Sequence, residues 1–204
     1  MALYLDPIHG NTNIWNIPWN IIDFEWVIKV KNPEPIEVGI VPIRQGAIQK
    51  DYIFESLIKP SKPIPSYAEN EMNITNTMLE NAPTLNDIKT VVRKIIMRGV
   101  FIEHSKNNCD IRCARNFFLI NANRMHHFNT HKISKLINQR AGKHRLNDLC
   151  NRWCVIHRNP HRAMHDALVT AKVFIKMLKL LEQNGISNFA KFKTFYNEGV
   201  EAFE

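Results

Sequence analysis

Three strand-like segments lie close together near the start of the chain, and only short turns separate them. They are rich in β-branched and aromatic residues, as strands are, and span residues 19–30, 36–43 and 51–58. Residues 33–35 (Pro-Glu-Pro) and the dipeptide Gln45-Gly46 mark the turns. Strands joined by short turns pair antiparallel, so this region predicts an antiparallel meander.

The rest of the chain predicts helices alternating with one short apolar strand. Helical patterns cover residues 75–80, 84–98, a segment beginning near Asp110, 146–149 and 163–181, and the strand covers 99–103. Small residues along one stripe of the helix at 163–181 let it press close to a sheet. Strands followed by such alternation predict an α/β layered domain with a mixed sheet.

Domain organisation follows from the same reading. A length of 204 residues suits one domain with its own core. We expect residues 1–18 to be an irregular lead-in, residues 19–181 to be the main domain, and residues 182–204 to be a tail or a docking helix.

The formal net charge of +8 indicates a basic surface, which favours polyanionic partners such as nucleic acid or anionic lipid. Residues 121–145 carry six Lys and Arg and four His without any acidic residue. This segment is either a surface for a nucleic-acid backbone or a solvated helix and loop.

No apolar run approaches the roughly 20 residues that span a bilayer, and residues 1–10 contain no apolar secretory core. We therefore expect a cytoplasmic protein without a membrane partner. The cysteines form two C-x3-C pairs, a spacing that does not match the usual C-x2-C zinc knuckle. We expect them to be small buried hydrophobic residues.

Four acidic residues and a histidine carry the chemistry. Asp23 and Glu25 are two apart on a predicted strand, so they share one face. Asp110 begins a helix, and Asp166 lies on the helix at 163–181. Carboxylates that gather at one point repel one another unless a cation lies between them. The set predicts a divalent-metal site, and His161 beside it is a candidate general base for phosphodiester hydrolysis, because an imidazole ring can take up a proton near neutral pH.

Each of these residues also has an ordinary explanation. Asp23 and Glu25 could face solvent from an edge strand, and Asp110 could be a first-turn acid favoured by the helix dipole. His161 could be a surface histidine beside Pro160. His165 is its close neighbour, but the spacing of His161 to Asp166 favours His161.

The order D-x-E, then Asp, then H-x4-D resembles the DEDDh branch of the DnaQ-like 3′–5′ exonucleases, which have a ribonuclease H-like fold. The resemblance covers about residues 20–181. It extends to segments around Glu37–Val41, Phe54–Ile64, Asn73–Pro83 and Leu146–Trp153. It implies a mixed five-stranded sheet, with three antiparallel strands and then parallel strands, flanked by helices.

The resemblance also implies roles. Two Mg²⁺ or Mn²⁺ ions would be held by Asp23, Glu25, Asp110 and Asp166, and His161 would deprotonate the attacking water. The substrate would be single-stranded DNA or RNA, or short oligonucleotides, shortened from the 3′ end to nucleoside 5′-monophosphates. A homodimer and a polymerase or other nucleic-acid-processing partner stay open. The alternative is a weakly active or non-catalytic nucleic-acid-binding module on the same fold.

Three departures from the family pattern adjoin the acids. Trp26 stands where many relatives have threonine, and it either stacks on the terminal base or packs in the core. His104 lies six residues before Asp110 instead of five, and Cys109 replaces a usual phenylalanine. We expect Phe24, Trp26 and His104 to contact the substrate.

Overall fold

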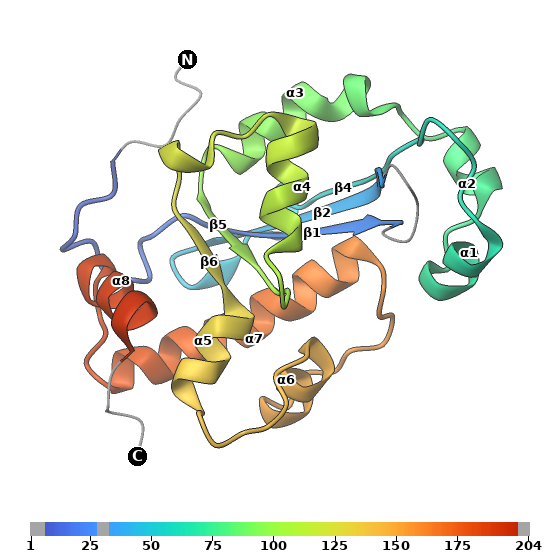
Figure 1. The fold of residues 1–204 in the computed structure, drawn as a ribbon. Helices are drawn as coiled ribbons and strands as arrows, with labels where there is room; N and C mark the ends of the chain where they lie inside the picture. The colour runs from blue at the N-terminus through green and yellow to red at the C-terminus, as the bar shows by residue number, and fades with distance from the viewer. Residues whose placement is uncertain (1–6, 28–32, 200–204) are drawn as a thin grey trace.

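A mixed sheet with helices on both faces forms the protein in the computed structural model, which describes residues 7–27 and 33–199 (Figure 1). The strands are β1 (Trp19–Trp26), β2 (Pro35–Arg44), β3 (Ala47–Ile48), β4 (Phe54–Leu57), β5 (Val100–Glu103) and β6 (His127–Asn129). The helices are α1 (Ser66–Met72), α2 (Asn76–Glu80), α3 (Leu85–Ile96), α4 (Cys109–Phe118), α5 (Thr130–Ile137), α6 (Leu146–Arg152), α7 (Ala163–Gln183) and α8 (Phe189–Glu198). The predicted α/β class with a mixed sheet is confirmed.

The strand order is β3-β2-β1-β5-β6, and β4 also pairs with β2. β2 runs antiparallel to β1, β3 and β4, whereas β5 runs parallel to β1 and β6 parallel to β5. Antiparallel strands followed by parallel strands are as predicted. The count of five is corrected to six, because the chain between the second and third predicted segments forms the two-residue strand β3, which pairs with the end of β2. The third segment itself begins in a short 3-10 helix at Lys50–Tyr52, and only Phe54–Leu57 forms a strand, β4.

Most other elements lie where the sequence places them. β2, β5, α2, α3, α4, α6 and α7 match their predicted segments within a few residues. The first segment forms β1 and ends at Trp26, while residues 28–30 of that prediction lie outside the described residues. The sequence analysis did not predict α1, or β6 within the basic segment 121–145.

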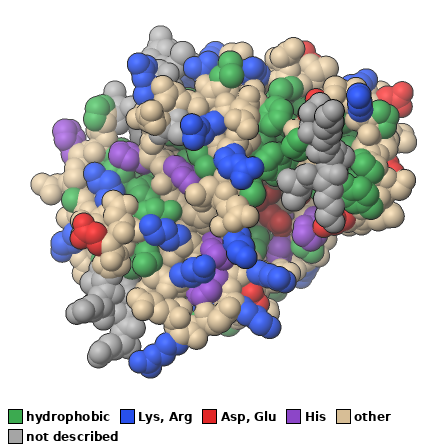
Figure 2. Space-filling model, viewed as in Figure 1, with side chains coloured by type: hydrophobic (Ala, Val, Ile, Leu, Met, Phe, Trp, Pro, Cys, Tyr) green, Lys and Arg blue, Asp and Glu red, His purple; other side chains and the backbone are tan. Residues whose placement is uncertain are grey.

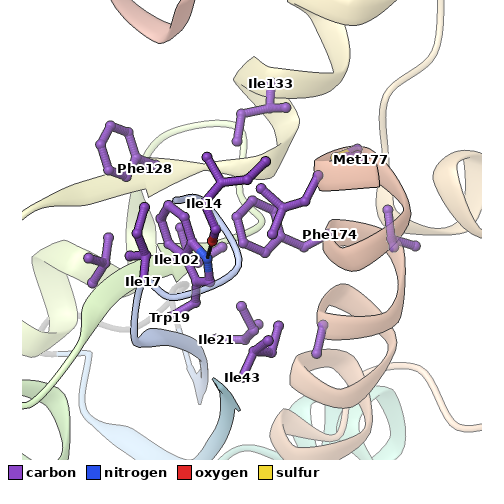
Figure 3. Packing of buried hydrophobic residues seen from close by; sticks show 14 of the residues in the cluster. Ile14, Ile17, Trp19, Ile21, Ile43, Ile102, Phe128, Ile133, Phe174 and Met177 are labelled. Carbon is purple, nitrogen blue, oxygen red and sulfur yellow. Dashed lines mark hydrogen bonds between the residues drawn. The ribbon is translucent and has the colours of Figure 1, made fainter. Parts of the chain in front are cut away.

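Two apolar clusters fill the layers on either side of the sheet. One joins the sheet to α7 and α8, and its centre is Trp19, which is fully buried (Figure 3). The Trp19 Nε1–H donates to the backbone oxygen of Ile14 at 2.9 Å, and its ring meets that of Phe174 edge to face. The other cluster packs α3 and α4 against the opposite face through residues such as Phe101 and Phe118.

The segments that flank residues 19–181 add side chains to the first cluster. Ile14 and Ile17 precede β1 and are fully buried, and Asn13 forms an isolated bridge to Asn188. Beyond α7, for which the sequence leaves a tail or a docking helix open, α8 buries Phe189, Phe192 and Phe195. Both flanks therefore pack on the same core.

Two findings bear on the composition. All four thiols are free, and Cys113 and Cys150 are buried as expected. The expectation of burial is wrong for Cys109, which is half-buried, and for Cys154, which is exposed. Among the residues that the structure describes, no helix combines the length and apolar character that crossing a membrane requires.

Gly39 on β2 lets α7 begin directly against the sheet. A Cβ atom at this position would lie 2.6 Å from the backbone carbon and oxygen of Ala163, the first residue of α7. Gly39 is also the cross-strand partner of Asp23. The missing side chain therefore brings the first turn of α7 to the level of Asp23.

Gly39→Ala is expected to destabilise the protein by about 1–3 kcal/mol, because the added methyl group overpacks a contact with backbone atoms that cannot yield easily. Urea unfolding measures the change. Gly142→Ala is the matched control, since no atom lies within 4 Å of its Cβ position, and its effect should stay within about 0.5 kcal/mol. Equal effects of the two substitutions would contradict the close approach.

Candidate active site

Three carboxylates meet at the carboxyl end of β1. Asp23 and Glu25 project from that strand, and Asp166 projects from the first turn of α7. One carboxylate oxygen from each of the three lies within 4.8 Å of the others, close enough to share a metal ion. Residues separated by some 140 positions in the chain are thus brought to one point.

Asp110 joins this group from α4. It is 4% exposed, and its Oδ1 accepts the backbone N–H of Phe24 at 3.1 Å, which places the carboxylate against β1 between Asp23 and Glu25. After burial, the charge of Asp110 has the largest effect in raising the pKa of Asp23. Asp110 is outside the tighter three-residue group but belongs to the same electrostatic site.

A buried ion pair fixes the start of α7. Glu37 on β2 is fully buried and lies opposite Glu25 in the strand pair. Its Oε1 accepts hydrogen bonds from Nε and Nη2 of Arg162 at 3.0 and 2.8 Å, and its Oε2 accepts the backbone N–H of Ala163 at 2.8 Å. This Glu37–Arg162 pair ties the helix that carries Asp166 to the strand beside Glu25.

A second buried acid, Glu103, holds Asp110. Glu103 Oε2 accepts the backbone N–H of Asp110 at 2.9 Å and the hydroxyl of Ser105 at 2.8 Å. Its Oε1 lies 2.5 Å from Nε2 of His127 on β6. The sequence analysis assigned no site role to Glu103, His127 or Arg162, because their partners are brought near only by the fold.

The acids raise one another's pKa. Burial is the main cause of the raised pKa of Asp23, and the charges of Asp110, Glu25 and Asp166 add to it. Burial, followed by the charges of Asp166 and Glu37, raises the pKa of Glu25 to about 8, and Arg162 opposes this rise. Burial also raises the pKa of Asp110 and of Asp166.

A divalent cation would relieve this repulsion, since it supplies the positive charge that the buried carboxylates lack. The donors are carboxylate oxygens, which hard cations such as Mg²⁺ and Mn²⁺ prefer. The residues present therefore fit a divalent-cation site.

Two histidines adjoin Asp166. His161 is exposed, has a left-handed backbone conformation with φ of 63°, and donates its backbone N–H to Asp166 Oδ2 at 3.3 Å. His157 is the one whose ring contacts the carboxylate: Nε2 lies 2.6 Å from Asp166 Oδ1, and Nδ1 lies 2.6 Å from Oδ1 of Asn147. The sequence analysis missed His157, since no motif or periodicity links it to an acid nine residues later.

A cleft of about 300 Å³ opens beside the acids, and Asp23, Glu25, Asp110 and His161 line it. Trp26 also lines it although the residue is only 8% exposed, so a core role and a cleft role coexist. Phe24 lines the cleft too, but its side chain is 4% exposed and stacks on Phe118 with ring centroids 5.3 Å apart. Contact of either aromatic ring with a substrate stays a prediction.

His104 lines the same cleft from the end of β5. Its Nδ1 lies 2.8 Å from Oγ1 of Thr130, and its ring lies edge to face with that of His131, with ring centroids 5.8 Å apart. Burial, and then the charge of His131, lowers the pKa of His104 to about 3. The ring is therefore neutral at pH 7, and any contact with a substrate would be a hydrogen bond and not an ion pair.

Comparisons with known proteins relate this chain to exonucleases. Residues 21–174 match the family model described as "Exonuclease". The "DNA polymerase III PolC-type" of Staphylococcus saprophyticus is 30% identical over 161 residues. This match covers 78% of the present chain but 11% of that polymerase, so the chain spans about a tenth of the length of this relative.

Solved structures share the fold. The nuclease domain of 3′hExo, described as a DEDDh family member bound to rAMP, has a TM-score of 0.65 and 15% identity over 82% of this chain and 94% of that one. Exonuclease X in complex with 5′ overhanging duplex DNA has a TM-score of 0.60 and 20% identity over 82% and 93%.

Asp23→Asn is expected to stabilise the protein in EDTA, and more so at pH 8 than at pH 5. A carboxyl whose pKa is raised by folding stabilises the fold only while it is protonated, and that contribution is lost as pH rises through its folded pKa. The neutral amide avoids this loss and also lowers the repulsion on Glu25, whose pKa is about 8. Thermal melting at both pH values measures the effect.

The exposed carboxyl of Asp51 provides the control, because Asp51→Asn removes the same charge outside the site. Mn²⁺ should raise the melting temperature of the wild type and of Asp51→Asn more than that of Asp23→Asn. Melting temperatures of Asp23→Asn that equal those of the wild type in EDTA at both pH values would contradict mutual repulsion.

Glu37→Gln is expected to cost about 2–3 kcal/mol of folding free energy, since it leaves the guanidinium of Arg162 without its buried partner. Glu55→Gln is the matched control: Glu55 lies 3.9 Å from Arg162 and its side chain is 51% exposed. This variant should change stability by less than about 1 kcal/mol. Urea unfolding measures the change in folding free energy for both variants. Equal losses of folding free energy would refute the role of the pair.

Proposed function

The chain belongs to the exonuclease family, and we propose that it is a metal-dependent 3′–5′ exonuclease that releases nucleoside 5′-monophosphates. The match confirms the family that the order of acidic residues indicated. The meeting of Asp23, Glu25 and Asp166, with Asp110 beside them, is the observation that carries the proposal. A site that only bound nucleic acid would gain nothing from buried like charges, so the non-catalytic alternative is disfavoured.

In the proposed mechanism Asp23, Glu25, Asp110 and Asp166 would hold two Mg²⁺ or Mn²⁺ ions. When bound, such ions neutralise phosphate charge and lower the pKa of water. The buried ring of His157 and the backbone N–H of His161 orient the carboxylate of Asp166. The Glu37–Arg162 pair keeps the start of α7 in register with Glu25.

His161 is the proposed general base. Its side chain is exposed at the lip of the cleft, where it can accept a proton from the attacking water and release it to solvent. His157 is less suited to this task, because both ring nitrogens already have partners in Asp166 and Asn147.

Single-stranded DNA or RNA, or a short oligonucleotide, is the proposed substrate. The structural relatives include a nuclease domain bound to rAMP and an exonuclease bound to duplex DNA with a 5′ overhang. Trp26 and His104 at the cleft offer an aromatic edge and a neutral hydrogen-bonding ring to the terminal nucleotide. A polymerase or other nucleic-acid-processing partner is proposed from the relationship to the PolC-type polymerase, and a homodimer stays a prediction.

Incubation with 3′- and 5′-labelled single-stranded DNA and RNA tests the proposal. The wild type should shorten the labelled DNA and the labelled RNA stepwise from the 3′ end in Mg²⁺ or Mn²⁺, but not in EDTA. Asp166→Asn should abolish the activity, and His161→Ala should lower kcat by about 10²–10⁴-fold because the general base is lost.

His165→Ala is the matched control, since His165 is an exposed histidine four residues after His161, in the first turn of α7, and its loss should leave kcat unchanged. Shortening from the 5′ end, or activity that survives Asp166→Asn, would contradict the proposed function. Full activity of His161→Ala together with loss in His157→Ala would move the general base to His157.

A further inference from the structure

Basic and histidine side chains gather beside the acidic site. Figure 2 shows Lys and Arg, with histidines among them, over α5 and α6 next to the acidic side chains near the middle of this face. We define the basic strip as Lys106, Lys135, Lys143 and Arg152, all of which are exposed. Lys106 belongs to the loop between β5 and α4, Lys135 to α5, and Arg152 ends α6.

Three histidine rings connect the cleft to this strip. His104 lines the cleft, its ring meets that of His131 at 5.8 Å, and His131 meets His144 at 6.0 Å. Lys106 and Lys135 lie near enough to His131 to lower its pKa, and Lys135 and Arg152 do the same to His144. The strip is therefore continuous with the wall of the cleft.

Hydrogen bonds hold parts of the strip in place. Arg152 donates from Nη1 to Oγ of Ser134 at 3.2 Å and from Nη2 to the backbone oxygen of Lys143 at 2.9 Å. The loop that carries Lys106 is fixed by Asn129, whose Nδ2 donates to the backbone oxygen of Ser105 at 2.7 Å. The guanidinium of Arg152 and the backbone next to Lys106 thus have a defined arrangement before any ligand arrives.

The positive charge of the strip is not balanced by nearby acids. In the part of the chain that the structure describes, no ion pair includes a strip residue. The charge of Asp148 opposes the lowered pKa of His144. The carboxylate of Asp148 accepts the backbone N–H of Arg145 at the start of α6. A row of unpaired cations leading to a cleft suits a ligand with regularly repeated phosphates.

We propose that the basic strip binds the phosphodiester backbone of a single strand whose 3′ end occupies the cleft. This inference rests on the proposed function and extends it, because it gives the direction in which the strand leaves the site: past His104, along α5 and α6. The site would then favour strands long enough to reach the strip over dinucleotides.

The test compares a dinucleotide with a single strand of about 12 nucleotides, a length typical of single-strand binding sites. For Lys106→Ala/Lys135→Ala, the ratio of kcat/KM for the long strand to kcat/KM for the dinucleotide should fall about tenfold at low salt. The slope of log(kcat/KM) for the long strand against log[salt] should become shallower by about 1.4, since each lost phosphate contact removes about 0.7.

Lys50→Ala/Lys94→Ala is the matched control. It removes the same charge from exposed lysines of the 3-10 helix and of α3, on elements outside the strip, and should leave both the ratio and the slope unchanged. An unchanged ratio in Lys106→Ala/Lys135→Ala, or an equal fall in the control variant, would overturn the proposal.

Binding without hydrolysis separates the strip from the proposed function. Fluorescence anisotropy of the labelled long strand with Asp166→Asn in EDTA reports affinity alone. The wild type could cleave nothing while Lys106→Ala and Lys135→Ala, added to Asp166→Asn, weaken binding of the long strand about tenfold. In that case the proposed function fails and the strip stands. If the added substitutions leave affinity unchanged, the strip fails whatever the activity.

Discussion

Mutual repulsion among half-buried and buried carboxylates at the end of β1 is the constraint that the surrounding structure has to meet. Asp23, Glu25, Asp110 and Asp166 come from three elements, and burial raises the pKa of each. The charges of neighbouring acids raise the pKa of Asp23, Glu25 and Asp110 further, whereas His157 opposes the rise at Asp166. Such a group cannot organise itself, because every approach of one acid to another costs free energy. Favourable contacts elsewhere in the fold offset this unfavourable electrostatic free energy.

Those contacts can be identified. Gly39 has no side chain that would keep α7 away from β2. On the same strand, Glu37 binds the guanidinium of Arg162 and accepts the backbone N–H of Ala163, the first residue of α7. On the other side, Glu103 accepts the backbone N–H of Asp110, and β1 donates a backbone N–H to the carboxylate of Asp110. Packing around Trp19, including the flanking helix α8, keeps the sheet and α7 together. The acids are therefore positioned by contacts that lie outside the acidic group itself.

The sequence predicted the parts of this arrangement that have local signals. Two-residue spacing put Asp23 and Glu25 on one face, and the small-residue stripe of α7 indicated its close packing on the sheet. The missed elements lack such signals: α1 buries only Ala68 and Met72, and β6 has three residues. His157, Glu103 and Arg162 could not be assigned roles because each depends on a partner that only tertiary structure brings near. The count of strands failed because β3 has only two residues and lies in the stretch that the sequence predicted as a turn.

Opposite charges lie next to each other around the cleft: buried acids suit cations, and the exposed basic strip suits phosphates. This separation explains how a chain with a formal net charge of +8 can hold a strongly acidic centre. We infer that this centre is a divalent-cation site. Anomalous X-ray scattering from crystals grown with Mn²⁺ provides the test. Mn²⁺ peaks are expected among the carboxylates of Asp23, Glu25, Asp110 and Asp166, whereas an absence of peaks at saturating Mn²⁺, with the four side chains in place, would refute a cation site.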